Sequence, residues 1–206
     1  MRFGQKQYAQ AAKAYEQGLS KADDLKVFAK MFRALVSAGN EKLADQKLSA
    51  VLTRFPKDVG LRSIAAEHYQ TVGRYADSLR LYEELLQTQP NNPAYLNNMA
   101  VLYQRTKDAR ALQVAEQAYK LAPDNVGIMD TLGWILVDHG QVARAIKLLK
   151  QAATQEPRAL STRYHLAVAL SKAGNKAEAK RELESLLKMK EGFPEEQEAR
   201  KLAAIL

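Results

Sequence analysis

Prolines recur at a nearly constant interval along this chain of 206 residues. Pro56, Pro90, Pro123 and Pro157 are separated by 34, 33 and 34 residues. An apolar series and a glycine series keep the same register: Met31, Ala65, Met99, Leu132 and Leu166, and Gly39, Gly73, Gly140 and Gly174. This self-similarity indicates internal repeats, each of which would bury its apolar face against its neighbours.

Each repeat holds two helical segments. In the fourth repeat the apolar residues follow spacings of three and four, as on one face of a helix: Met129, Leu132 and Leu136, then Ala145, Leu149 and Ala152. Gly140 separates the two segments, and Pro157 cannot continue the second one. The run "TLGWILV" is ambiguous alone, because a buried strand reads the same way, but the repeat makes it a helix. We therefore predict an all-α fold.

The predicted organisation has five repeats between two flanking segments. The repeats cover residues 25–58, 59–92, 93–125, 126–159 and 160–193. The glycine missing from the series falls at 105–109, where one residue is also lost. Residues 1–24 read as the second helix of a truncated preceding repeat, and we expect its Tyr8, Tyr15 and Leu19 to expose apolar surface and to favour self-association. Residues 194–206 read as a capping helix whose Leu202, Ile205 and Leu206 cover the fifth repeat.

The repeats resemble the tetratricopeptide repeat (TPR), a helix–turn–helix of about 34 residues with the pattern Trp-x2-Leu-Gly-x2-Tyr, then Ala-x3-Phe, then Pro. The fourth repeat matches this pattern at Leu132, Gly133, Leu136, Ala145, Leu149 and Pro157. The resemblance implies a right-handed α-solenoid in which the first helix of each repeat lines a concave groove. In that family the groove binds extended or helical peptides, so the resemblance implies a protein-binding scaffold.

A more specific resemblance concerns three segments, "NNMAVLYQRTKDARALQVAEQAYKLAPDN", "DTLGWILVDHGQVARAIKLLKQA" and "KEGFPEEQEARKL". They are similar to the C-terminal end of the TPR-repeat lipoproteins of the exosortase/PEP-CTERM system. That resemblance implies a role in protein sorting and exopolysaccharide production at the cell envelope, with a periplasmic or outer-membrane-associated location. The family's lipobox cysteine is absent from this chain, so the location rests on resemblance. A cytosolic TPR adaptor is the alternative.

The peptide-contacting slots of the family are the second, fifth, ninth, twelfth and thirteenth residues of a repeat. Carried onto this sequence, they give the candidate groove residues Arg33, Glu67, Asn97, Val101, Arg105, Asp130, Trp134, Val137, Tyr164 and Val168. Five of these would form an apolar, aromatic patch across repeats three to five: Val101, Trp134, Val137, Tyr164 and Val168. Asp130 and Glu67 occupy slots that hold lysine or asparagine in carboxylate-binding grooves. We therefore expect a mixed apolar–polar ligand and not an acidic C-terminus.

Trp134 is the only tryptophan, and it is not the structural tryptophan of the family. Met129 fills that slot, five residues earlier. Two roles stay open for Trp134: packing between neighbouring first helices, with Val101 and Val168 as partners, or contact with a ligand. The two roles are compatible, because a half-buried aromatic side chain is a common interface anchor.

The sequence contains no recognisable carrier of catalysis. It has no cysteines, and His68, His139 and His165 share no metal-ligand spacing. There is no glycine-rich phosphate loop and no Ser-x-x-Lys motif. We therefore expect no enzyme activity, no catalytic residues, no cofactor and no metal.

The net charge of +8 is spread along the chain without a basic tract. We therefore expect no nucleic-acid partner, and a basic nucleic-acid-binding solenoid is the less favoured alternative, which a salt-titrated binding assay would separate. No apolar run reaches the roughly 18 residues that a membrane span requires, so no transmembrane segment is expected.

Overall fold

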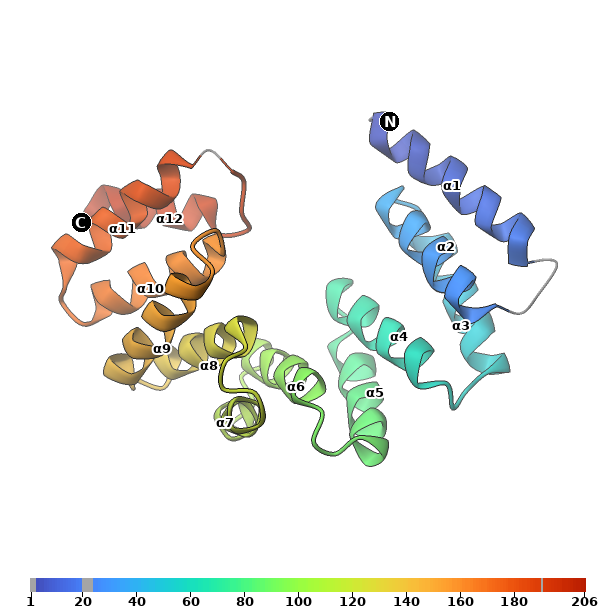
Figure 1. Cartoon of the computed structure of the whole chain (residues 1–206), viewed down its shortest axis with the longest axis horizontal. Coiled ribbons are helices and arrows are strands. Elements are labelled where there is room, and N and C mark those ends of the chain that lie inside the picture. Colours follow the sequence, from blue (N-terminus) through green and yellow to red (C-terminus); the bar gives the residue numbers. More distant parts are fainter. Residues whose placement is uncertain (1–2, 20–23, 190) are drawn as a thin grey trace. The chain divides into compact units, whose positions relative to one another are not determined.

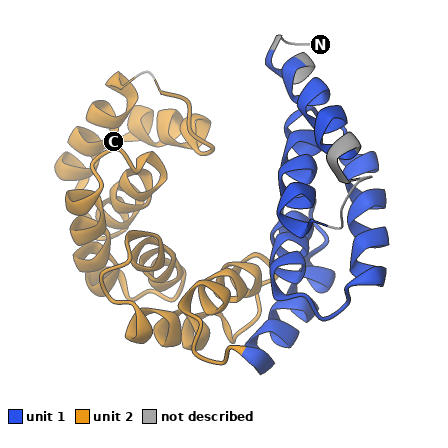
Figure 2. Cartoon of the chain, turned by 45° about the vertical axis from the view of Figure 1, so that its right-hand side comes forward, with its two compact units in different colours: residues 1–88 blue, residues 89–206 orange. Residues whose placement is uncertain are grey.

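The computed structural model describes residues 3–19, 24–189 and 191–206, which form twelve α-helices and no strand. The all-α fold predicted from the repeats is confirmed. The chain divides into two compact units, residues 1–88 and 89–206 (Figure 2), which we call the N-terminal and C-terminal units. No helix among the described residues is long and apolar enough to cross a membrane.

The N-terminal unit holds the first five helices (Figure 1). They are α1 (Phe3–Leu19), α2 (Leu25–Ser37), α3 (Glu41–Arg54), α4 (Val59–Thr71) and α5 (Tyr75–Thr88). Helix α1 packs against α2, α3 contacts both α2 and α4, and α4 packs against α5. On α1, Ala12 is buried and Tyr8 is 49% exposed, whereas the side chain of Leu19 lies outside the described residues. The second-helix role of α1 in a preceding repeat stays a prediction.

The C-terminal unit holds the other seven helices. They are α6 (Pro93–Arg105), α7 (Ala111–Leu121), α8 (Val126–Asp138), α9 (Val142–Gln155), α10 (Leu160–Lys172), α11 (Lys176–Lys188) and α12 (Glu196–Ile205). Three helical hairpins result, α6 with α7, α8 with α9 and α10 with α11. Helix α8 also contacts α6 and α10, so the three first helices lie side by side (Figure 1). Helix α12 packs against α11.

The first helices begin at periodic side-chain caps. Asp24, Asp58, Asn92 and Asn125 each accept a hydrogen bond from a backbone N–H in the first turn of α2, α4, α6 and α8. This satisfies donors that have no partner inside the helix. Ala159 precedes α10 and offers no such bond, so this helix begins without a side-chain cap.

Four of the five first helices, α2, α4, α8 and α10, end at glycines in the left-handed region. The φ angles are 74° at Gly39, 80° at Gly73, 71° at Gly140 and 81° at Gly174. In the fourth repeat the N–H of Gln141 then donates to the carbonyl of Leu136 at 2.9 Å, which closes the helix end. The glycine series in the sequence therefore records a backbone conformation that other residues adopt at a cost.

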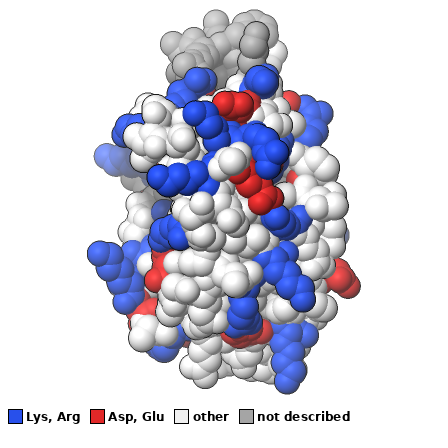
Figure 3. Space-filling model, turned by 90° about the vertical axis from the view of Figure 1, so that its left-hand side faces the viewer, with Lys and Arg blue, Asp and Glu red and all other residues white. Residues whose placement is uncertain are grey.

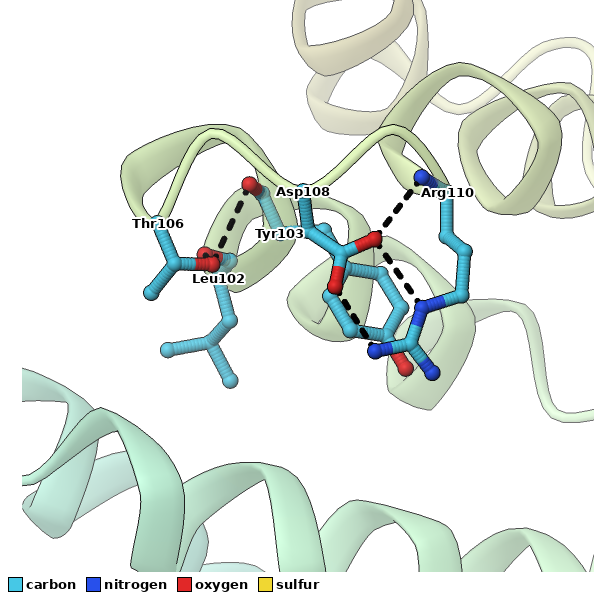
Figure 4. Close-up of polar contacts among 5 residues, drawn as sticks. All are labelled: Leu102, Tyr103, Thr106, Asp108 and Arg110. Atoms are coloured by element: carbon cyan, nitrogen blue, oxygen red, sulfur yellow. Dashed lines mark hydrogen bonds and ion pairs between the residues drawn. The ribbon is translucent and has the colours of Figure 1, made fainter.

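In the third repeat Lys107 takes the place of that glycine. Its φ is 57°, the only positive φ among the described non-glycine residues. The loop that follows is closed by Asp108, which accepts from the backbone N–H of Arg110 at 2.9 Å and from its guanidinium at 3.0 and 2.7 Å (Figure 4). The Arg110 guanidinium also lies 4.3 Å from the ring centroid of Tyr103. These hydrogen bonds hold the pKa of Asp108 down to about 2.

Close packing between α8 and α9 depends on a second kind of glycine. A Cβ at Gly133 would lie 2.6 Å from Cγ of Leu149, which is fully buried. The two helices therefore approach through the surface that Gly133 leaves free. In the same hairpin Met129, Leu132 and Leu136 are also fully buried.

Helix α12 and the residue after it contact the fifth repeat through part of their apolar side chains. Leu202 and Leu206 pack against a core cluster that includes Tyr164 and Leu183. Ile205, however, is 76% exposed, so its expected contact with the fifth repeat is wrong. Leu202 and Ile205 are three residues apart, but only Leu202 lies on the buried face of the short helix α12.

Candidate functional site

Trp134 lies in the middle of α8 and meets α10 with one part of its ring. The ring stacks on the imidazole of His165, with centroids 4.3 Å apart and an interplanar angle of 17°, and it lies 6.3 Å from the ring of Tyr164. The side chain is nevertheless only partly buried. Trp134 therefore packs against a neighbouring first helix, with His165 and Tyr164 as its ring partners, and it keeps accessible surface. Contact with a ligand stays a prediction.

The accessible part of Trp134 lines a cavity of about 340 Å³, which we call the Trp134 pocket. Its walls are Val101, Gln104, Arg105, Asp130, Thr131, Trp134, Asp138, His165 and Glu195. The first eight belong to the first helices α6, α8 and α10, and Glu195 directly precedes α12. No lining residue comes from the second helices α7, α9 and α11. The volume is near the lower end of small-ligand pockets, and suits one or a few side chains.

Three carboxylates in the Trp134 pocket are fixed by neutral or imidazole donors. Asp130 Oδ1 lies 2.8 Å from Nδ1 of His165, whose ring N–H donates to it. Asp138 Oδ2 accepts from Nε2 of Gln104 at 2.7 Å.

The third carboxylate, Glu195, accepts through Oε2 from Oγ of Ser161 at 2.8 Å. None of the three carboxylates pairs with a lysine or arginine in the described part of the chain. Arg105 is the only lysine or arginine that lines the pocket. The pocket therefore holds three carboxylates and one guanidinium.

Four of the predicted groove residues come together in this pocket: Val101, Arg105, Asp130 and Trp134. Asn97 lies one turn before Val101 on α6, outside the lining. Its Oδ1 atom is buried and has no hydrogen-bond partner among the described residues. Unpaired buried acceptors are uncommon and costly, so Asn97 stands out in an otherwise well-packed hairpin.

The predicted apolar patch across repeats three to five is wrong at three of its side chains. Val137 is only 2% exposed and belongs to the core. Tyr164 is 9% exposed and shares a cluster with Leu183. Val168 packs against that same cluster, together with apolar residues of α12 and of the chain before it.

For Tyr164 and Val168 the reason is that the C-terminal segment, including α12, packs on this part of the fifth repeat. Burial therefore raises the pKa of the Tyr164 hydroxyl, and the negative charges of Glu198 and Glu195 add to the effect. The apolar surface left in the Trp134 pocket is that of Val101 and Trp134.

Arg33 and Glu67, the other two predicted groove residues, lie in the N-terminal unit. They line a second cavity, of about 320 Å³, with Phe32, Val36, Ser37, Ile64, His68 and Thr71. His68 is buried here, 2.8 Å through Nε2 from Asp45 Oδ1, with the ring of Phe32 edge-on at 5.0 Å. Each pocket is thus formed inside one unit.

Three residues of the Trp134 pocket were not assigned to a groove slot from the sequence: Thr131, His165 and Glu195. The repeat period in the sequence contained a signal for these three residues. Thr131 and His165 occupy the sixth position of their repeats, and Glu195 follows its partner Ser161 by 34 residues, which continues the period past the fifth repeat. Gln104 and Asp138 are also 34 residues apart, so contacts between equivalent positions of successive repeats build the pocket.

The described residues contain no group of three histidine, aspartate or glutamate side chains placed to hold a metal ion. His139, outside both pockets, bonds through Nδ1 to the carbonyl of Ile135 at 2.9 Å, as expected for a histidine at a helix end. The chemistry that the Trp134 pocket offers is recognition through an aromatic ring, fixed carboxylates and one guanidinium.

Comparison with known families agrees with the repeat. Family models described as "Tetratricopeptide repeat" match residues 65–126 and 136–205. The crystal structure of YrrB, described as a TPR protein with an unusual peptide-binding site, superposes with a TM-score of 0.61 at 16% identity, over 92% of this chain and 99% of that one. At this identity the likeness shows the fold alone.

Two curated relatives are similar in sequence. The TPR repeat-containing protein PA4667 of Pseudomonas aeruginosa is 29% identical over 129 residues, which are 60% of this chain and 21% of that protein. Cellulose synthase 1 operon protein C of Komagataeibacter xylinus is 28% identical over 158 residues, 75% of this chain and 12% of that protein. The chain therefore spans about a fifth and about an eighth of the two relatives.

Proposed function

We propose that this chain, whose residues 65–126 and 136–205 belong to the tetratricopeptide-repeat family, is a non-catalytic scaffold that binds a segment of a protein partner in the Trp134 pocket. TPR repeats are protein-interaction modules, and solenoids of stacked repeats bind partners along the surfaces of neighbouring units. The observation that carries the proposal is the half-buried Trp134, which stacks on His165 and lines a cavity of about 340 Å³.

The geometry of Trp134 suits an anchor for a partner. Stacking on His165 fixes the ring before binding, so little rotamer freedom is lost when a partner docks. Buried aromatic anchors surrounded by polar groups contribute a large share of the binding free energy in many interfaces. YrrB is a TPR protein with an unusual peptide-binding site, and this neighbour of the same fold supports a peptide as the ligand.

The binding proposal is tested with a peptide-display selection on the whole chain, followed by titration of selected peptides. Calorimetry measures affinity in every variant, and the fluorescence of Trp134, the only tryptophan, reports occupancy in the variants that keep it. Trp134→Ala is expected to cost about 2 kcal/mol or more of binding, which is roughly thirtyfold in Kd. Leu121→Ala, at an exposed apolar side chain of α7 outside the pocket, should leave binding unchanged. Equal loss in both variants would argue against a Trp134 anchor.

For the biological setting we propose exopolysaccharide or protein-sorting assembly at the cell envelope, of the exosortase type, with a periplasmic or outer-membrane-associated location. Two observations support it: the resemblance of three segments to exosortase-system TPR lipoproteins, and the similarity to cellulose synthase 1 operon protein C. Fractionation of the tagged protein in its native host tests the location. Recovery in the cytosolic fraction would favour the alternative, a cytosolic TPR adaptor.

Self-association through α1 is a separate proposal. Tyr8 on this helix is 49% exposed, and exposed large apolar side chains are the usual contacts of such an interface. Tyr8→Ser should then lower the average mass that light scattering reports at high protein concentration. A monomeric mass for the unchanged chain at that concentration would count against the proposal.

A further inference from the structure

We infer that the Trp134 pocket recognises a basic side chain, an arginine or lysine of the bound segment. This inference rests on the proposed function and specifies its ligand. It differs from carboxylate recognition, because the groups that face the cavity carry mainly negative charge: Asp130, Asp138 and Glu195 against Arg105.

The three carboxylates are oriented and still have free acceptor capacity. Each uses one oxygen for its hydrogen bond, to His165, Gln104 or Ser161. The second oxygen of each has no hydrogen-bond partner among the described residues. A carboxylate oxygen can accept from a guanidinium or ammonium N–H, and such charge-assisted bonds are stronger than neutral ones. The donor that would use this capacity has to come from the ligand.

Trp134 supplies the second element of a basic-residue site. A guanidinium or ammonium over an indole face is attracted by the ring quadrupole, and tryptophan is the best of the aromatic side chains for this contact. The aliphatic part of an arginine or lysine would also cover Val101 and the indole, which are the apolar surface of the pocket. Arginine is expected to bind better than lysine, because its planar fork can satisfy two oxygens and stack at the same time.

The charge of the pocket is opposite to that of the chain. The net charge is +8, and on the face shown in Figure 3 lysine and arginine are numerous and scattered among neutral residues, with carboxylates between them. A chain of this composition has no general excess of carboxylates. The concentration of three of them around one tryptophan is therefore a local property of the site. Arg105, exposed at the same pocket, would compete with the basic group of a ligand.

The experiment uses the whole chain and a short blocked peptide with alanine, serine and leucine around one central residue. The central residue is arginine, lysine, glutamine or glutamate, and binding is followed by calorimetry and by Trp134 fluorescence. The arginine peptide is expected to bind about tenfold more tightly than the glutamine peptide, as a hydrogen-bonded charge pair contributes. Its affinity should fall as salt is added, and the glutamate peptide should bind most weakly.

Conservative variants test which carboxylates cause the preference for the arginine peptide. Asp138→Asn and Glu195→Gln keep the hydrogen bonds to Gln104 and Ser161 while removing charge, and each should reduce the preference for arginine over glutamine. Asp124→Asn makes the same charge change at an exposed residue outside the pocket and should leave that preference intact. Arg105→Ala, which removes the internal competitor, should strengthen arginine binding.

The results that contradict the basic-residue inference can be distinguished from the result that also contradicts the proposed function. Equal affinity for the arginine and glutamine peptides, with both sensitive to Trp134→Ala, overturns the basic-residue inference and leaves a peptide site. Tighter binding of the glutamate peptide overturns the inference by reversing its sign. If no peptide of the set binds at low salt, the proposed function of this pocket fails together with the inference.

Discussion

Gly133→Ala would test whether the approach of α8 to α9 is set by one missing methyl group. The new Cβ would lie 2.6 Å from Cγ and 2.8 Å from Cδ2 of Leu149. Cγ is the branch point of a fully buried side chain, so it cannot swing away as a flexible chain end can. Overpacking a well-filled core costs typically about 1–3 kcal/mol, and this contact belongs at the upper end. Replacing glycine inside a helix returns about 1 kcal/mol, so the net loss of unfolding free energy should be about 2 kcal/mol.

Gly127→Ala is the matched control in the same helix. A Cβ there meets only Oδ1 of Asn125, at 3.4 Å, which is ordinary contact. The substitution should therefore stabilise the chain by about 0.5 kcal/mol through the lower backbone entropy of the unfolded state. The difference in unfolding free energy between the two alanine variants is then about 2.5 kcal/mol, the sum of these two effects.

Urea unfolding followed by Trp134 fluorescence measures this difference where it arises, because the tryptophan is the neighbour of Gly133. Circular dichroism at the same urea concentrations reports whether the other repeats unfold together with α8 and α9. In a double-mutant cycle Leu149→Ala should cost less in the Gly133→Ala background than alone, since it removes the clash. The fifth repeat has Ala167 and Leu183 at the equivalent positions, both fully buried. If α8 and α9 can relax to that spacing, Gly133→Ala will be as stable as Gly127→Ala, and the steric argument is refuted.

Three further predictions concern single side chains. Lys107→Gly should raise the unfolding free energy by about 0.5–1 kcal/mol. The strain of a residue with a Cβ in the left-handed region exceeds the extra backbone entropy that glycine loses on folding. Lys107→Ala, measured in the same urea titration, should give no gain. The pKa of Asp108 is lowered from 3.8 to about 2, so its stabilisation is present above about pH 4 and lost as the pH falls towards 2, and Asp108→Asn should flatten the pH dependence of the melting temperature in that window. The pKa of Tyr164 is raised above 10.0 by burial, so the stability it supports is present below pH 10 and lost as the pH rises through the higher value. Spectrophotometric titration of the chain against Tyr164→Phe should show a late-ionising tyrosine, and a normal titration would contradict its burial.

Much of the fold could be read from local chemistry in the sequence. A glycine that must take a positive φ, a proline that cannot continue a helix and apolar residues at helical spacing act over a few residues each, so their periodic recurrence predicts the helices. The third repeat shows the limit of this reading. The sequence shows that a glycine is missing at 105–109. The backbone conformation that replaces it depends on the folded loop, in which Lys107 has a positive φ beside the Asp108–Arg110 ion pair.

The candidate site was predicted in part for a related reason. Family slots assign a direction to a side chain on its own helix, and this was enough to bring Val101, Asp130 and Trp134 to one pocket. A position within the repeat does not show which other part of the chain packs against that side chain. In the fifth repeat the opposing surface is the C-terminal segment, which covers Tyr164 and Val168.

The sequence by itself determined the all-α repeat and the face of α8 that carries Trp134, because both follow from helical periodicity within one repeat. Only the tertiary structure decided that His165 stacks on that tryptophan, that Glu195 joins the same pocket and that Val137 is buried. The first two outcomes depend on contacts between residues about one repeat apart, Trp134 with His165 and Ser161 with Glu195, where the spacing and rotation of neighbouring helices determine which side chains meet. Asp130 and Asp138 already flank Trp134 on α8, and the folded C-terminal segment adds Glu195 as the third carboxylate of the pocket.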